Sequence, residues 1–397
     1  MQRSESASDR AITDIAEVRR HNMRAILRVV EQSGQASRAD IARVSGLSQP
    51  TVCAAVDGLI EAGLLSVAGE GSSTGGRPPL MLELNAERQY SVGVDLGGTN
   101  LRVGIADLAG NIVFRCEWPS PGRLGTKGDP AVAFIGDAIR RTVEQWGLGL
   151  SRVGAIGLGA PGVTDPATGV VSIAPAFEWQ DTPVAAILHD IFKVPVRVDN
   201  DVNAATIAEL HYGCGQELRD FVFVSIGTGV GAGIVIDGRL HRGATGAAGE
   251  IGYLVIDHTW QGSTIYDFGC FETMAASGTI LTMAAQAMGD PDATPEDLFR
   301  AAGEGHSQAG QTVRAIANRI AAAFSSIAAL IDPQAIVLGG GISGAGEVLF
   351  RPVRERLAEL SPFVPELRTS RLGTNAGLVG AAVLAIEEIK ERALQNI

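Results

Sequence analysis

The first 85 residues place their apolar positions at the spacing of three short helices. The first predicted helix starts near Glu17 and is expected to end at Gly34. The second helix begins at Ser37. Ser37 and Asp40, three residues further on, resemble a capping box although the usual partner is Glu or Gln. The second and third helices are expected to turn inward Ile41, Val44, Val52, Ala55, Val56, Leu59 and Ile60.

The last two of these helices are joined through Gly46, and this arrangement is typical of a helix-turn-helix. Ser48 is expected to cap the last helix, because a serine oxygen accepts the free N–H groups of a first turn. The exposed residues at the start of such a helix contact base edges in the major groove of DNA. Here they are Ser48, Gln49, Thr51 and Cys53. The alternative is a three-helix interaction module that does not bind DNA.

The next stretch, LLSVAGEGSSTGGRPPLMLELN, predicts two strands around a Gly/Ser tip. Such a hairpin is a wing, and Arg77 at its exit is expected to enter a minor groove. The net charge of −12 argues against nucleic acid, but residues 1–88 carry 10 basic and 11 acidic side chains, so nearly all the excess lies further on. An N-terminal domain with almost no net charge can still bind DNA if its arginines lie on one face. The first helix carries Arg19, Arg20, Arg24 and Arg28, although alone this cluster favours a solvated face.

The overall composition narrows the class of protein further. Apolar residues make up 46% of the 397 residues, and no uninterrupted apolar run reaches the length of about 18 that a membrane span needs. The start has no apolar segment of the kind found in secretory signals. The four cysteines are scattered, which argues against a disulfide framework. We therefore expect a cytoplasmic, nucleoid-associated protein without a membrane partner.

Beyond residue 85 the pattern changes to strands separated by glycine turns. In YSVGVDLGGTNLRVGIADLAGNIVFR, apolar residues alternate on both sides of the first turn, so this loop joins two strands. A dinucleotide-binding or Walker loop would lead into a helix instead. Gly97 and Gly98 allow backbone N–H groups to approach a phosphate, Thr99 adds a hydroxyl, and Asp95 is placed to face a hydrated Mg²⁺.

The strand-turn-strand pattern recurs once, and a third glycine segment follows a later strand. DFVFVSIGTGVGAGIVIDGRL is again strand, turn and strand, with Gly227, Thr228 and Gly229 at the turn. AIVLGGGISGAG is a strand that ends in glycines before a predicted helix, and Gly340 and Gly341 there suit the edge of a nucleoside. Two related hairpins indicate two similar half-domains with a cleft between them. The arrangement resembles the actin/hexokinase-like fold.

A polar cluster follows another predicted strand in VPVRVDNDVNAATIAELHYG. The strand delivers Asp199, Asn200 and Asp201 to the start of a helix. A carboxylate at a strand end that faces a cleft is placed to take a proton from a sugar hydroxyl. The alternative is a helix N-cap, for which Asp and Asn are favoured on structural grounds alone.

With these motifs together, the chain resembles the ROK family of repressors, open reading frames and sugar kinases over nearly its full length. The motifs that carry the likeness are DLGGT, APG, ND, GAAGEIG, GCFE and the helix-turn-helix with its Gly-Gly-Arg-Pro exit. The resemblance implies that Asp201 is the catalytic base if the protein is a kinase. It also implies that Asn200, Glu250 and Glu272 hold sugar hydroxyls.

The sequence departs from the family's zinc-binding pattern. Tyr253 stands where zinc-containing members have a histidine that also touches sugar, so the preferred sugar is left open. Ser263 and Ile265 replace two cysteines, Tyr266 replaces a glycine, and Cys270 alone survives. A structural zinc site needs about four nitrogen or sulfur ligands. We therefore expect no zinc.

Two functions from different classes follow from these features. We expect a winged helix-turn-helix over residues 1–85 and a sugar-kinase-like α/β body over residues 86–397, with the C-terminal helix returning to the first half-domain. The first hypothesis is a repressor of carbohydrate genes that binds double-stranded operator DNA as a homodimer or tetramer and responds to a sugar. It requires no cofactor. The alternative is a sugar kinase with a DNA-binding head, which requires ATP and Mg²⁺. A sugar-binding interaction protein without DNA function is disfavoured by the wing and Arg77.

Overall fold

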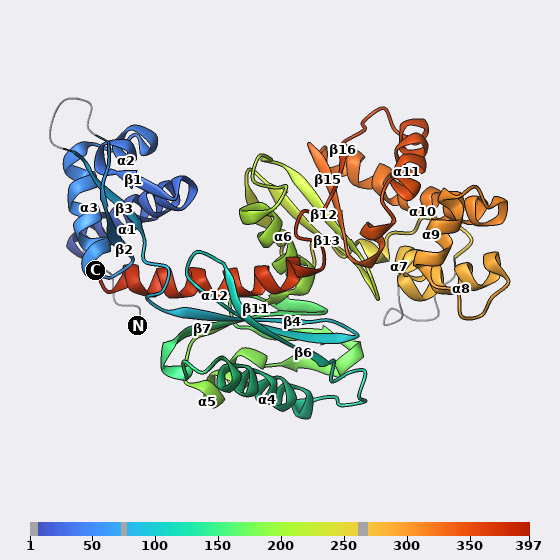
Figure 1. The fold of residues 1–397 in the computed structure, drawn as a ribbon, viewed down its shortest axis with the longest axis horizontal. Helices are drawn as coiled ribbons and strands as arrows, with labels where there is room; N and C mark the ends of the chain where they lie inside the picture. The colour runs from blue at the N-terminus through green and yellow to red at the C-terminus, as the bar shows by residue number, and fades with distance from the viewer. Residues whose placement is uncertain (1–6, 73–77, 261–268) are drawn as a thin grey trace.

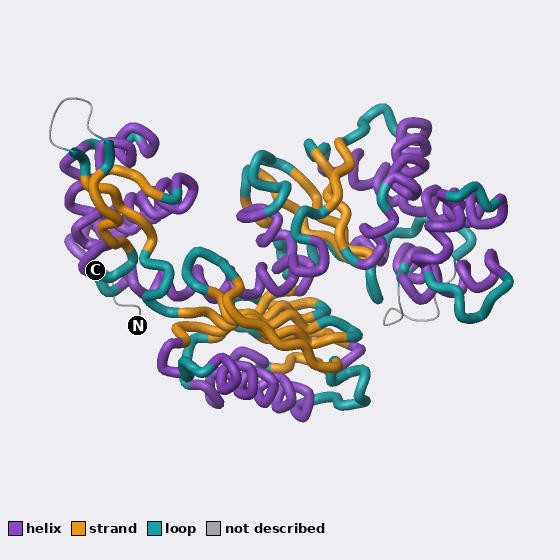
Figure 2. Tube along the Cα trace, in the orientation of Figure 1, coloured by secondary structure: helices purple, strands orange, loops and turns teal. Residues whose placement is uncertain are grey.

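The chain folds into a small N-terminal head and two lobes, each lobe built on a five-stranded sheet (Figure 1). The computed structural model describes residues 7–72, 78–260 and 269–397. Figure 1 shows the long C-terminal helix running from the lobes to the head. Figure 2 shows that helices cover the sheets in both lobes.

The head combines three helices with a three-stranded antiparallel sheet in the order β1-β3-β2, as a winged helix-turn-helix does. Its elements are α1 (Ala7–Ser33), β1 (Gln35–Ser37), α2 (Arg38–Ser45), α3 (Gln49–Glu61), β2 (Leu65–Glu70) and β3 (Leu80–Leu84). The predicted capping box between Ser37 and Asp40 is present, and the Ser48 side chain accepts the Thr51 N–H.

Two local expectations for the head were wrong. The first helix begins at Ala7, well before Glu17. Val44 is 56% exposed, although Ile41 one turn earlier is fully buried, because the last turn of the eight-residue α2 lies beyond the core of the head. The tip of the predicted wing, with Arg77, lies outside the described residues.

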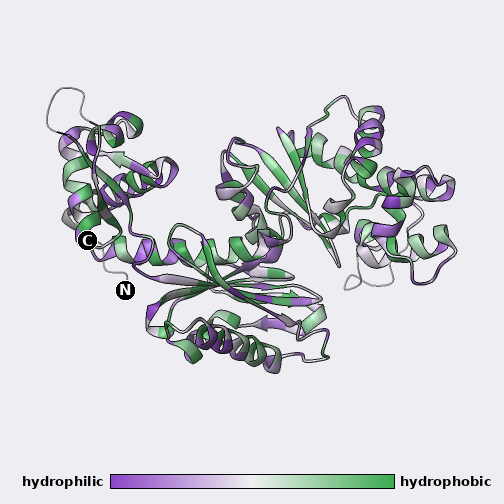
Figure 3. Cartoon of the chain, in the orientation of Figure 1, coloured by the Kyte–Doolittle hydropathy of each residue, from purple (hydrophilic) through white to green (hydrophobic). Residues whose placement is uncertain are grey.

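The first lobe surrounds a sheet in the order β11-β7-β4-β5-β6. The strands are β4 (Tyr90–Leu96), β5 (Asn100–Ala106), β6 (Ile112–Pro119), β7 (Val153–Ala160) and β11 (Val196–Asn200); a small sheet adds β8 (Val163–Asp165), β9 (Val170–Ala174) and β10 (Trp179–Thr182). The helices α4 (Asp129–Trp146) and α5 (Val184–Phe192) cover one face. Hydrophobic residues of α4 pack in the core with those of the sheet, whereas its outer positions are polar (Figure 3).

The second lobe repeats the same strand topology. Its sheet has the order β14-β13-β12-β15-β16, with antiparallel pairing on one side of β12 and parallel pairing on the other, as around β4. The strands are β12 (Phe221–Ile226), β13 (Val230–Ile236), β14 (Arg239–His241), β15 (Ala335–Gly339) and β16 (Glu366–Thr369). The helices are α7 (Cys270–Ala275), α8 (Ser277–Met288), α9 (Pro295–Gly303), α10 (Ser307–Ile331) and α11 (Glu347–Leu360). This duplication confirms the predicted actin/hexokinase-like fold.

Helix α10 is long and apolar enough to cross a membrane by length and composition alone. One face of it, including Val313, Ile320 and Phe324, is buried in the core of the second lobe. This burial is what a core helix of a globular domain requires.

Two helices, α6 (Asp201–Tyr212) and α12 (Ala376–Gln395), pack closely against each other where the lobes meet. A Cβ built at Gly380 would lie 1.7 Å from the Ala204 carbonyl oxygen, so only glycine permits this approach. Helix α12 also packs on β4 and β7 of the first lobe. Its C-terminal part shares a hydrophobic core with the head, and this contact was not predicted.

Candidate functional site

The glycine turns of the two lobes face each other. Gly97, Gly98 and Thr99 lie between β4 and β5, and the turn from Gly227 to Gly229 lies between β12 and β13. A Cβ built at Gly98 would lie 3.0 Å from the Thr228 Oγ1. One amide of each turn is used within the turn, because the Gly97 N–H donates to the Asn100 carbonyl oxygen and the Gly227 N–H to the Gly229 carbonyl oxygen, both at 2.9 Å.

The third glycine segment borders an apolar cavity in the second lobe. Gly340 has a φ of +75°, and a Cβ there would lie 2.4 Å from the Ile226 carbonyl oxygen, so the turn requires glycine. A cavity of about 380 Å³ lies beside Gly341 and is lined by Ile280, Phe299 and other residues. An apolar slot next to such turns suits the flat face of a nucleoside base.

Asp95 is held at the end of β4 by an arginine of the neighbouring strand. The Arg102 Nη1 donates to the Asp95 Oδ2 at 3.2 Å and to the Thr374 carbonyl oxygen at 3.1 Å. Burial raises the pKa of Asp95, and Arg102 opposes that shift. The first turn of α12 abuts this carboxylate, because a Cβ at Gly377 would lie 2.6 Å from the Asp95 Oδ1. Asp95 thus lies between the first glycine turn and the C-terminal helix.

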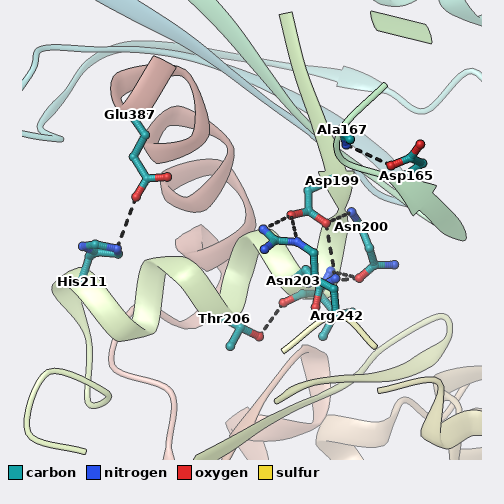
Figure 4. Close-up of polar contacts among 10 residues, drawn as sticks. Asp165, Ala167, Asp199, Asn200, Asn203, Thr206, His211, Arg242 and Glu387 are labelled. Carbon is teal, nitrogen blue, oxygen red and sulfur yellow. Dashed lines mark hydrogen bonds and ion pairs between the residues drawn. The ribbon is translucent and has the colours of Figure 1, made fainter. Parts of the chain in front are cut away.

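Asn200 is both a helix cap and a residue of the predicted sugar site. Its Oδ1 accepts the Asn203 N–H at 3.0 Å (Figure 4). The same oxygen accepts the Val202 N–H at 2.9 Å, and the Nδ2 donates to the Gly162 carbonyl oxygen at 3.0 Å. The capping alternative is therefore correct for the oxygen. The amide nitrogen keeps a second hydrogen for another partner.

Asp201, the first residue of α6, has a pKa far above that of an ordinary aspartate. Its removal from water, followed by the nearby Asp95 and Glu250 carboxylates, raises its pKa to about 7. A carboxylate with a pKa near neutrality is well matched to accept a proton from a hydroxyl. This is the group that the resemblance to sugar kinases assigns as the base.

Glu250, Tyr253 and Glu272 lie close enough to one another for their charges to interact, and Glu250 also acts on Asp201. Burial and then the Glu272 carboxylate raise the pKa of Glu250. The Glu272 Oε2 accepts the Val230 N–H at 2.7 Å beside the glycine turn of the second lobe, and burial raises the pKa of Glu272. Tyr253 is 56% exposed, and burial of its hydroxyl, with the charges of Glu250 and Glu272, raises its pKa. The predicted sugar-site residues therefore influence one another's charge.

An ion pair that no sequence pattern predicted joins the two lobes at Asp199, next to Asn200. The Arg242 Nη2 and Nε donate to the Asp199 Oδ2 at 2.6 and 3.0 Å (Figure 4). Asp199 is 1% exposed. The two residues belong to different lobes and are 43 positions apart, so no local pattern links them. An arginine in the glycine-rich segment before GAAGEIG was the only available indication.

The predicted DNA-contacting residues lie at the start of α3. Ser48 and Gln49 are exposed, whereas Thr51 and Cys53 are partly buried. The Ser48 Oγ also lies 2.8 Å from the Thr51 Oγ1. The arginines of α1 do not form a purely solvated face, because Arg24 forms a two-bond ion pair with Glu391 of α12, with both bonds at 2.6 Å.

Metal ligands can be located in residues 7–72, 78–260 and 269–397, the part of the chain that the structure describes. Within those ranges no group of three or more His, Cys, Asp and Glu side chains converges as metal ligands do. Cys270 is buried at the start of α7. The substituted positions Ser263, Ile265 and Tyr266 lie outside the described residues. The absence of zinc therefore stays a prediction.

Comparison with known proteins places the chain in a family. Residues 91–388 match the model of the ROK family. The chain belongs to the ROK family. This confirms the resemblance drawn from the glycine turns and the Asn200-Asp201 motif.

ROK regulators match more of the chain than a ROK kinase does. The xylose repressor of Caldicellulosiruptor bescii is 26% identical over 381 residues, covering 92% of this chain and 95% of the repressor. A solved ROK family transcriptional regulator, a homologue of the E. coli MLC protein, has a TM-score of 0.82 at 26% identity and covers 96% of this chain and 98% of its own. The glucokinase of Halalkalibacterium halodurans is 33% identical over 321 residues, covering 76% of this chain and 96% of the kinase.

Proposed function

We propose that this ROK protein is a sugar-responsive transcriptional repressor of carbohydrate-metabolism genes. The observation that carries the proposal is the combination, in one chain, of a winged head with two kinase-like lobes and a helix, α12, that contacts both the head and the lobes. The full-length match to ROK regulators supports the same function. The protein acts at operator DNA in the cytoplasm and is nucleoid-associated.

The effector is a sugar or sugar derivative bound by Asn200, Asp201, Glu250, Tyr253 and Glu272. A sugar offers many hydroxyl groups, and each needs a hydrogen-bond partner once water is excluded. The cluster supplies carboxylates, an amide nitrogen and a phenol. The raised pKa values of Asp201, Glu250 and Glu272 indicate that these carboxyl groups are costly to hold ionised without such partners.

The head binds double-stranded DNA through Ser48, Gln49, Thr51 and Cys53 of α3, with Arg77 in the minor groove. N-terminal residues of a recognition helix reach base edges in the major groove, and a two-fold operator requires two heads in register. We therefore assign a homodimer or a tetramer as the active form.

Helix α12 connects the two functions. Its first turn lies against Asp95, its middle packs against α6, which begins with Asp201, and its end binds the head through Arg24 and Glu391. A sugar that changes the spacing of the lobes therefore also moves helix α12, against which the head packs. The free energy by which the sugar changes DNA binding cannot exceed the difference in sugar-binding free energy between the two arrangements.

A second candidate function is an ATP-dependent sugar kinase that carries a DNA-binding head. The observation that favours it is the pKa of Asp201 near 7, together with the three glycine segments and the cavity beside Gly341. In that case the nucleotide is held by residues of the three glycine segments and by the aspartate before the first of them. These are Asp95, Gly97, Gly98, Thr99, Gly227, Thr228, Gly229, Gly340 and Gly341. The nucleotide would supply the phosphoryl group and Mg²⁺ would balance its charge.

Two assays of the purified chain separate the two functions. One is calorimetry with glucose, xylose and N-acetylglucosamine, and the other measures ATP turnover with the same sugars. The repressor predicts sugar binding without turnover, and the kinase predicts turnover that Asp201→Asn abolishes. Binding that is unaffected by replacing both Glu250 and Glu272 with alanine would refute the proposed sugar site.

A further inference from the structure

Arg242 joins the two lobes at the back of the candidate sugar site. It follows β14 in the second lobe, and its guanidinium donates twice to the Asp199 Oδ2 at the end of β11 in the first lobe. Figure 4 shows this contact beside Asn200 and the first turn of α6. The pair therefore lies where the first lobe presents its sugar-site residues.

Among the described residues, Arg242 is the only charged partner of Asp199. Its Oδ1 is already occupied, because it accepts the Asn200 N–H at 2.8 Å and the Asn203 Nδ2 at 3.3 Å. The side chain is 2% exposed, whereas that of Arg242 is 33% exposed. Removing one partner of a buried ion pair leaves an uncompensated charge in a poorly hydrated place, which is strongly unfavourable. The strand end that carries Asn200 is thus stabilised from the other lobe.

Arg242 also begins the loop that carries Glu250. Its carbonyl oxygen accepts the Ala248 N–H at 3.2 Å, which closes residues 242–248 into a turn, and the Gly249 carbonyl oxygen accepts the Ala232 N–H at 2.8 Å. The loop packs against the first lobe as well, because a Cβ at Gly246 would lie 2.7 Å from the Thr164 carbonyl oxygen. Fixing Arg242 to Asp199 therefore fixes the start of the segment that ends at Glu250.

We propose that Arg242 is a positioning residue that holds the Glu250 loop of the second lobe against the Asn200 and Asp201 strand end of the first lobe, and so sets the affinity of the cleft for its sugar. Arg242 acts through Asp199 and the loop rather than by touching the sugar. The part of this inference that concerns affinity rests on the proposed sugar-binding function. The part that concerns the loop does not.

The first test follows hydrogen exchange in the sugar-free protein, at the amides of Ala232 and Ala248. Arg242→Gln removes the charge and is expected to speed exchange at both amides by about tenfold, because the loop opens more often. Arg242→Lys keeps the charge and is expected to restore most of the protection. Arg239→Gln, an exposed arginine on β14, is the matched control and is expected to leave exchange unchanged. Unchanged exchange in Arg242→Gln, or an equal effect of Arg239→Gln, would overturn the proposal.

The second test measures the affinity of the same variants by calorimetry with glucose, xylose and N-acetylglucosamine. Arg242→Gln is expected to weaken whichever sugar the wild type binds by about tenfold, with partial recovery in Arg242→Lys. An Arg242→Gln affinity equal to that of the wild type would overturn the affinity claim. If the wild type binds none of the three sugars, the proposed sugar-binding function fails for them, and the exchange result alone decides the role of the loop.

A double variant guards against simple misfolding of Arg242→Gln. Asp199→Asn with Arg242→Gln replaces the ion pair by two neutral amides, so no buried charge is left without a partner. Its thermal midpoint is expected to lie closer to that of the wild type than the midpoint of Arg242→Gln does. Its loop exchange is still expected to be faster than in the wild type, because the charged tether is gone. Wild-type exchange in the double variant would overturn the proposal.

Discussion

Replacing Asp201 with asparagine should stabilise the folded protein above neutral pH and leave it unchanged in acid. The pKa of Asp201 is raised from its usual 3.8 to about 7, first by burial and then by the Asp95 and Glu250 carboxylates. A carboxyl group with a higher pKa in the folded state binds its proton more tightly there than in the unfolded chain. The wild type therefore loses stability as the pH rises from about 4 to about 7.

The size of this effect follows from the shift. About three pKa units at 1.36 kcal/mol each give roughly 4 kcal/mol, and water that enters the cleft screens part of it, so we expect about 2 to 4 kcal/mol above pH 7. Asparagine has nearly the shape of a protonated aspartate and carries no charge at any pH. The variant should therefore match the wild type near pH 4 and exceed it increasingly up to pH 8.

Urea unfolding at pH 4, 5, 6, 7 and 8 provides the measurement. The difference in free energy of unfolding between Asp201→Asn and the wild type should grow with pH and level off near pH 8. Asp292→Asn, which removes an exposed carboxylate, is the control and should show little dependence on pH. A difference that stays flat with pH, or a variant that is less stable than the wild type at pH 8, would refute the reasoning about the cleft.

Three further predictions concern the head, the wing and metal. Breaking the ion pair between head and body with Arg24→Ala or Glu391→Gln should keep sugar affinity within about twofold but reduce the sugar-dependent change in DNA affinity measured by fluorescence anisotropy. A full response would contradict the role given to this ion pair. Arg77→Ala should weaken duplex binding by roughly 1–3 kcal/mol, and an unchanged affinity and salt dependence would mean that the wing does not contact DNA. Elemental analysis should find no stoichiometric zinc, and one tightly held zinc per chain would refute that expectation.

The fold was largely predictable because its determinants are local. Glycine turns between alternating strands identify the two hairpins, and a short capped helix followed by a second one identifies the head. The third strand of the head was missed, because β1 is only three residues long and follows a helix directly. The outward position of Val44 could not be read from periodicity, since periodicity does not say where the core ends.

The candidate site was predictable only in part. Asn200 and Asp201 follow a recognisable strand, but the hydrogen bond from Asn200 to Gly162 joins residues 38 positions apart. The sequence gives even less indication of the role of Arg242, because that role depends on a partner in the other lobe. The ion pair between Arg24 and Glu391 spans 367 positions, and only the folded chain brings the two residues together. Contacts of this kind have no spacing that a sequence pattern could reveal.

The central claim is that one chain both binds specific DNA and changes that binding when a sugar enters its cleft. The most direct test selects duplexes from a random DNA library with the purified protein and titrates the enriched duplex with and without glucose, xylose and N-acetylglucosamine. The account predicts enrichment of a two-fold symmetric site and a change in affinity of about fivefold or more with at least one sugar. No enrichment, or a sugar that calorimetry shows to bind but that leaves DNA affinity unchanged, would contradict it.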